Sequence, residues 1–106
     1  MDLDAVRKRL ETDLRGLLSR HTRLTSHLRN EDRDIPSDWT EMAQFMENDE
    51  VLEALEERTR ERVDAMARAI ERIDEGIYMT CARCGGPIEP ERLDVLPTTT
   101  VCAKCA

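Results

Sequence analysis

The first 29 residues carry a heptad pattern of apolar side chains. The pattern predicts a helix that spans residues 2–29. Two rows of the heptad form one apolar face that packs against a partner helix, and the charged residues lie on the other faces. The rows are Leu3, Leu10, Leu17 and Leu24, and Arg7, Leu14, His21 and Leu28, with Val6 and Leu18 beside them. The pattern therefore predicts a long amphipathic helix that packs along one narrow seam.

Residues 30–37, NEDRDIPS, interrupt this pattern. Pro36 disfavours the helical conformation at Ile35, and the aspartates before it are typical turn residues. Because a connection this short makes the two flanking helices antiparallel neighbours, the segment predicts the turn of a helical hairpin.

A second apolar stripe predicts one continuous helix from Asp38 to about Glu75. The stripe consists of Phe45, Leu52, Leu55, Thr59, Val63, Met66, Ile70 and Ile73. The two successive steps of four between Leu55, Thr59 and Val63 predict a shift of the seam at that point. Gly76 follows as a candidate C-terminal cap.

The strongest chemical signal is the pair of Cys-x2-Cys motifs near the end of the chain, Cys81 with Cys84 and Cys102 with Cys105. Seventeen residues separate the two motifs, a spacing typical of a four-cysteine zinc site. Two disulfides or a redox Cys-x2-Cys are the alternatives, but no N-terminal stretch resembles a secretory signal, and redox motifs normally occur once. With four protein ligands the metal has no open position, so we expect one structural Zn²⁺ and no catalysis.

The segment around the cysteines has few apolar side chains for a core of its own. The candidates are Tyr78, Ile88, Leu93, Val95, Leu96 and Val101. Since so small a core does not stabilise a segment of this size without a cross-link, we expect metal binding to be required for the segment to fold. The predicted architecture is all-α dominated: an antiparallel two-helix coiled-coil hairpin over residues 1–76, followed by a small four-cysteine zinc-finger module over residues 77–106.

Charge narrows the possible partners. The formal net charge is −7, which opposes tight binding to the phosphates of DNA or RNA and favours an electropositive protein partner. Arg83, Arg92 and Lys104 leave a zinc-dependent nucleic-acid binder as a weaker alternative. No apolar run is long enough to cross a bilayer, so we expect a soluble, cytoplasmic protein with no membrane association.

The C-terminal residues resemble the zinc-finger signature of the DksA/TraR family of bacterial regulators. The resemblance rests on the run AIERIDEGIY at 69–78, on Cys81-x2-Cys84-Gly85, and on Ile88, Arg92-Leu93, Pro97 and Cys102-x2-Cys105. It implies a non-enzymatic transcription regulator that binds RNA polymerase directly, without binding DNA, and inserts a coiled-coil tip into the secondary channel. The chain stops one residue after Cys105, where longer members continue into a helix that contributes to a ppGpp site, so we do not predict dependence on ppGpp.

The resemblance also implies an acidic tip near residues 30–43. The family motif Asp-x-x-Asp-x-Ala corresponds here to Asp38, Glu41 and Ala43, with Glu in place of the second Asp, and Trp39 is a candidate partner contact beside them. The same residues have a second interpretation, because Asp at an N-cap with Glu three positions later also starts a helix. Both interpretations stay open at this point.

A different class of function also fits the leucine seam. In this alternative the protein is a zinc-capped coiled-coil adaptor or dimerisation protein with no role at the polymerase, and the first helix pairs with a second chain. The regulator hypothesis instead expects a monomer whose first helix packs against its own second helix.

Overall fold

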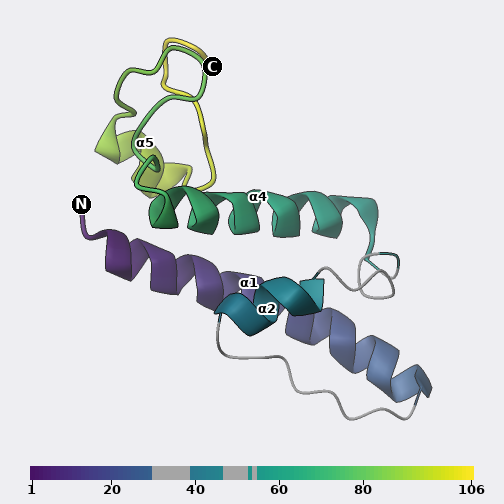
Figure 1. Cartoon of the computed structure of the whole chain (residues 1–106). Coiled ribbons are helices and arrows are strands. Elements are labelled where there is room, and N and C mark those ends of the chain that lie inside the picture. Colours follow the sequence, from purple (N-terminus) through teal and green to yellow (C-terminus); the bar gives the residue numbers. More distant parts are fainter. Residues whose placement is uncertain (30–38, 47–52, 54) are drawn as a thin grey trace.

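The computed structural model describes the backbone of residues 1–29, 39–46, 53 and 55–106, and the side chains of those residues apart from 20–29 and 45. The helices are α1 (Leu3–Arg29), α2 (Trp39–Met46), α4 (Glu57–Asp74) and α5 (Pro90–Val95) (Figure 1). The molecule is elongated, with principal extents of 49 × 25 × 20 Å. The described part of the chain has no strand, only an isolated antiparallel bridge between Thr80 and Pro87.

Helix α1 confirms the helix expected over residues 2–29. Asp2 caps its start, since the Ala5 N–H donates to Asp2 Oδ1 at 3.2 Å. Among the side chains of α1 that the structure describes, Leu10, Leu14 and Leu18 are fully buried, whereas Leu3 and Leu17 of the predicted heptad row are only partly buried. Because residues four apart lie on the same side of a helix, these three leucines form one buried row. Leu24 and Leu28 of the predicted seam lie outside the described side chains.

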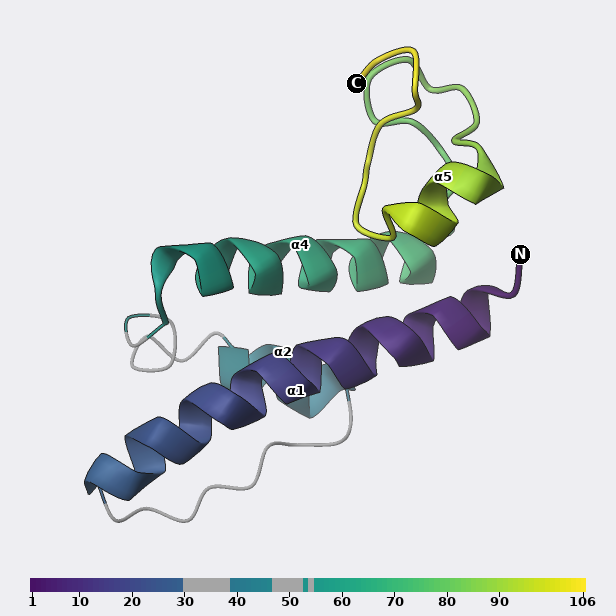
Figure 2. The ribbon, with the colours of Figure 1, turned by 180° about the vertical axis from the view of Figure 1, so that it is seen from behind.

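Helix α4 runs antiparallel to α1 along much of its length (Figures 1 and 2). Val63, Ala69 and Ile70 are its buried residues and belong to the same core cluster as the α1 leucines. At the end of the hairpin next to the cysteine segment, Arg7 of α1 pairs with Asp74 of α4. The Nε–Oδ1 and Nη2–Oδ2 distances are 2.8 and 3.1 Å. The predicted antiparallel helical hairpin is therefore confirmed.

The expectation of one continuous helix from Asp38 to Glu75 is wrong. Glu56 has extended backbone angles (φ −61°, ψ 150°) and α4 begins after it, so the helical path is broken there. Leu55, directly before the break, is 4% exposed. The two steps of four between Leu55, Thr59 and Val63 marked the right place, but the chain keeps both Leu55 and Val63 buried by breaking the helix rather than by unwinding it. The predicted turn at 30–37, and Leu52 and Phe45 of the predicted stripe, lie outside the residues or side chains described.

Helix α2 adds a third helix to the hairpin. It lies over the middle of α1 in Figure 1 and behind α1 in Figure 2, and α1 continues past it to Arg29. Met42 is 0% exposed, and Trp39 and Met46 are partly buried against the common core. The outward side of α2 carries the exposed Glu41. None of the described helices is long and apolar enough to span a bilayer.

The C-terminus of α4 is closed as the sequence predicts. Gly76 has φ 75°, and the N–H groups of Gly76 and Ile77 donate to the carbonyls of Ile73 and Arg72 at 3.1 and 2.9 Å. These two bonds form a Schellman motif, which needs a left-handed residue at the Gly76 position. The motif turns the chain away from the hairpin and into the cysteine segment.

Candidate metal centre

Two short backbone turns position the four cysteines. In the first turn the Cys81 N–H donates to Gly86 O at 2.7 Å and the Gly85 N–H to Cys81 O at 3.0 Å, with Gly85 at φ 73°. In the second turn the N–H groups of Cys105 and Ala106 both donate to Cys102 O at 3.1 Å. Each turn brings the two cysteines of one Cys-x2-Cys motif to the same side of the backbone.

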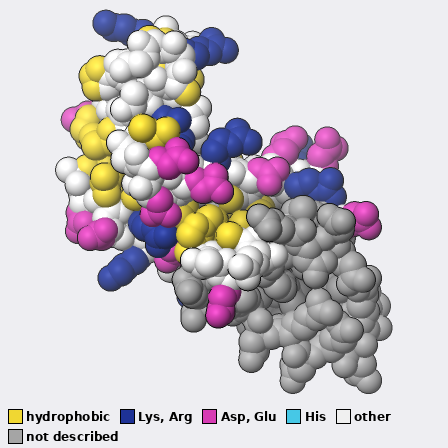
Figure 3. Space-filling model, viewed as in Figure 1, with side chains coloured by type: hydrophobic (Ala, Val, Ile, Leu, Met, Phe, Trp, Pro, Cys, Tyr) yellow, Lys and Arg dark blue, Asp and Glu magenta, His cyan; other side chains and the backbone are white. Residues whose placement is uncertain are grey.

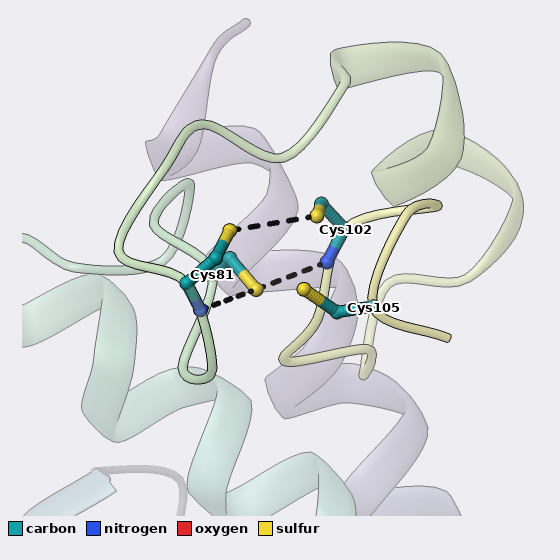
Figure 4. A group of neighbouring side chains, drawn as sticks. Cys81, Cys102 and Cys105 are labelled. Atoms are coloured by element: carbon teal, nitrogen blue, oxygen red, sulfur yellow. Dashed lines mark hydrogen bonds between the residues drawn. The ribbon is translucent and has the colours of Figure 1, made fainter.

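A backbone hydrogen bond joins the two turns. The Ala82 N–H donates to Thr100 O at 2.7 Å, which places the segment before Cys102 against the segment after Cys81. The side chains of Cys81, Cys102 and Cys105 point toward one common centre (Figure 4). All four predicted ligands, Cys81, Cys84, Cys102 and Cys105, are thus brought together with their sulfur atoms within 4.8 Å of one another.

This geometry fits a tetrahedral zinc ion. A Zn–S bond of about 2.3 Å implies sulfur atoms about 3.8 Å apart at the corners of a regular tetrahedron. Cys84 Sγ and Cys102 Sγ, which come from different motifs, lie 3.7 Å apart. Four thiolates fill the coordination sphere, so the centre holds one ion and has no open position for a water or a substrate. Its role is to fix the fold of the segment around it.

Backbone amides prepare one sulfur atom for the metal. The N–H groups of Cys84 and Cys102 donate to Cys81 Sγ at 3.5 and 3.4 Å. These bonds, that from Cys84 first, lower the pKa of Cys81 to about 6, because a hydrogen bond to the thiolate favours the charged form. The side chains of Cys102, Cys81 and Cys84 raise the pKa of Cys105 to about 12. Metal binding must therefore displace a proton from Cys105.

The small core beneath the metal differs in part from the sequence prediction. Tyr78, Ile88 and Leu93 are each 1% exposed, as expected. Val95 and Leu96 were expected in the same core, but they are 78% and 46% exposed. The reason is that α5 ends at Val95 and buries its Leu93 side, so the two following apolar positions turn outward.

Tyr78 joins the exit of α4 to the loop after α5. Its hydroxyl donates to Pro97 O at 2.7 Å. Burial, followed by the nearby Asp94 carboxylate, raises the pKa of the Tyr78 hydroxyl, while Arg9 of α1 acts in the opposite direction. The hydroxyl is therefore a neutral donor at physiological pH.

We expect Tyr78→Phe to lower the free energy of unfolding by about 1 kcal/mol, because it removes one hydrogen bond and leaves Pro97 O without that donor. The aromatic ring remains, so its packing in the core should contribute about as much to stability as in wild type. Urea unfolding of the zinc-loaded proteins measures the difference. An unfolding free energy equal to that of wild type would mean that water replaces the Tyr78 hydroxyl without loss.

The candidate tip residues are not part of this centre. Trp39, Glu41 and Ala43 lie on α2, with Glu41 exposed and the other two partly buried. Asp38 lies outside the described residues. Sequence reasoning also assigned no role at the metal to Arg72, Arg83 and Arg92, which the structure places against backbone carbonyls of the cysteine segment.

Comparisons with known proteins agree with the geometry. The prokaryotic dksA/traR C4-type zinc finger matches residues 76–106. An uncharacterized protein of Aquifex aeolicus (strain VF5) is 36% identical over 76 residues, which are 72% of this chain and 52% of that protein. The chain thus spans about half the length of this curated relative.

A solved structure extends the similarity beyond the zinc finger. The transcription factor DksA2 from Pseudomonas aeruginosa matches with a TM-score of 0.63 and 31% sequence identity, over 97% of this chain and 78% of that one. The similarity thus includes the helical hairpin as well as the segment that carries the cysteines. On this evidence of sequence, metal ligands and fold, the chain belongs to the DksA/TraR family.

Proposed function

We propose that this protein is a transcription regulator that acts on bacterial RNA polymerase and has no catalytic activity of its own. The observation that carries the proposal is the match to a transcription factor over 97% of this chain, hairpin included. A closed four-cysteine centre supports the absence of metal catalysis, because no coordination position is left for a substrate. The net charge of −7 supports a protein partner rather than direct contact with DNA.

In this proposal the hairpin, residues 1–76, inserts into the polymerase, and the zinc module, residues 77–106, docks on its surface. The hairpin enters the secondary channel of the polymerase, and Asp38, Trp39, Glu41 and Ala43 contact the interior. The last three of these residues lie on α2, beside the middle of α1 (Figure 1). Glu41 supports this role, since its carboxylate is exposed on α2. The zinc module and the base of the hairpin dock on the outer surface of the polymerase.

The exposed pair at the end of α5 supports docking by the zinc module. Hydrophobic side chains reach the surface over α5 in Figure 3, and Val95 is 78% exposed. Leu96, beside it, is 46% exposed. Because adjacent exposed apolar side chains mark contact sites more often than scattered ones, we assign Val95 and Leu96 to the docking surface.

The alternative of a leucine-seam dimer has less support from the fold. Leu10, Leu14 and Leu18 are 2%, 0% and 1% exposed within one chain. A second chain would have to displace α2 or α4 to reach them. The regulator proposal therefore expects a monomer, which sedimentation measures directly.

The test is a pull-down of zinc-loaded protein with bacterial RNA polymerase core, with a known secondary-channel factor as competitor. We expect wild type to bind and the competitor to displace it. Asp38→Asn/Glu41→Gln should bind within a fewfold of wild type but lose the effect on transcription, because the substitutions remove charge from the tip and leave the docking surface intact. Val95→Asn/Leu96→Asn should instead bind roughly tenfold more weakly, the loss expected for one or two apolar contacts.

The matched control is Glu61→Gln/Asp64→Asn, which removes two exposed charges from α4. It should behave as wild type in both assays. Failure of wild type to bind polymerase at low salt would contradict the proposal and favour the adaptor alternative. Binding that the competitor does not displace would place the contact outside the secondary channel.

A further inference from the structure

Two arginines, one from α4 and one from α5, donate hydrogen bonds to the backbone carbonyls that directly precede the two Cys-x2-Cys motifs. Arg72, in the last turn of α4, donates from Nη2 to Ile77 O at 3.0 Å and also to Thr80 O. Arg92, in α5, donates from Nε to Val101 O at 3.0 Å. Thr80 directly precedes Cys81 and Val101 directly precedes Cys102, so each arginine fixes the carbonyl before the first cysteine of a pair.

Both arginines extend from helices that are anchored by buried core residues and not by metal ligands. Arg72 lies two residues after the buried Ile70 on α4, and the Schellman motif at Gly76 folds the chain back so that the carbonyls of Ile77 and Thr80 face the last turn of the helix. Arg92 precedes Leu93, which is 1% exposed and anchors α5 on the core. Each arginine therefore links a helix to one of the cysteine turns through hydrogen bonds.

The contact of Arg72 also connects the metal centre to the hairpin. From Thr80 O the path runs through the Arg72 side chain to α4, which packs on α1 through Ile70 and pairs with it through Asp74 and Arg7. The contact of Arg92 differs, since α5 and Val101 both belong to the segment that contains the cysteines. Each arginine thus donates to the carbonyl before the first cysteine of a pair, but Arg72 connects the metal centre to the hairpin and Arg92 connects it to α5.

We propose that Arg72 and Arg92 are positioning residues that set the affinity for zinc, and that Arg72 in addition couples metal occupancy to the stability of the hairpin. In the folded centre each arginine holds the carbonyl that precedes a metal ligand, and removal of groups that orient metal ligands typically weakens binding. Coupling of this kind is reciprocal: a folded hairpin raises metal affinity by the same factor as the metal stabilises the hairpin. The proposal does not depend on any partner of the protein.

Metal affinity is the first measurement. We expect Arg72→Met and Arg92→Met to bind Co²⁺ and Zn²⁺ roughly 10- to 100-fold more weakly than wild type, in titrations that follow the cobalt–thiolate absorption and in competition with a chelator. Methionine keeps much of the apolar stem and removes the donors. Arg68→Met is the matched control, because Arg68 is exposed on the same helix, and it should bind as wild type does.

A conservative variant separates donation to the carbonyls from packing. Arg72→Lys keeps a cationic donor, so it should bind the metal more tightly than Arg72→Met. Affinities of Arg72→Met and Arg92→Met within twofold of wild type would overturn the proposal, and so would equal losses in Arg68→Met. Equal affinities of Arg72→Lys and Arg72→Met would overturn the assignment to hydrogen bonding.

Coupling is the second measurement, and it uses the helical circular dichroism signal during thermal unfolding with and without metal. In wild type the metal should raise the unfolding temperature of the helices. We expect this rise to shrink in Arg72→Met and to persist in Arg92→Met when both are saturated with metal. The same rise in Arg72→Met as in wild type would overturn the coupling, whatever the result with polymerase.

Discussion

Removal of the metal, by chelation or by Cys102→Ser, is expected to unfold residues 77–106. Structural zinc in small zinc-finger peptides supplies about 10–16 kcal/mol of apparent binding free energy, more than this module obtains from its core. That core consists mainly of Tyr78, Ile88 and Leu93. Without the ion, no covalent bond joins the four sulfur atoms, which lie within 4.8 Å of one another.

The amide NMR spectrum measures this unfolding. Signals from the module should collapse to the shifts of an unfolded chain in the chelated protein and return when zinc is added. Ala103→Ser is the matched control, because it places a serine at an exposed position beside Cys102 and removes no ligand. A module that keeps dispersed signals after complete removal of the metal would contradict the structural role of the zinc.

Leu14→Ala is expected to destabilise the hairpin by about 2–5 kcal/mol. Leu14 is 0% exposed in the middle of the buried row of α1, and the alanine would leave a cavity that rigid neighbouring helices fill only in part. A loss of this size is a large fraction of the total stability of a small domain, which is about 5–15 kcal/mol.

Urea unfolding followed by circular dichroism measures the loss. Asp13→Ala is the control, since Asp13 is the exposed neighbour on the same helix and its replacement should change stability by less than about 0.5 kcal/mol. The cobalt–thiolate absorption of Leu14→Ala should keep the shape of the wild-type spectrum, which would locate the damage in the hairpin. A stability equal to that of Asp13→Ala would show that Leu14 is not a core residue in solution.

The metal centre was the most predictable part of this molecule. Two Cys-x2-Cys motifs place four thiolates on two tight turns, and the chemistry of the ligands then determines the ion and its closed coordination. The leucine row of α1 was similarly informative, because periodic burial is a property of one helix and its pattern of side chains. Gly76 could be assigned as a cap because the left-handed backbone required there favours glycine.

Features that depend on tertiary packing were not predictable in the same way. The apolar stripe continues across Glu56, and its two steps of four indicated a shift of the seam there but not an extended backbone. Val95 and Leu96 look like core residues by type, and only the orientation of α5 turns them outward. The contacts of Arg72 and Arg92 join residues to carbonyls five to nine positions away through non-helical turns, and no pattern in the sequence encodes that geometry.

The ion pair between Arg7 and Asp74 has a practical consequence for experiments on this protein. It holds the start of α1 beside the end of α4, so both chain termini lie at the zinc end of the molecule (Figure 1). An affinity tag, a fluorophore or a fused domain attached at either terminus would therefore sit away from the end of α1 at Arg29. Labels can report on this protein from its zinc end while the opposite end is left unobstructed.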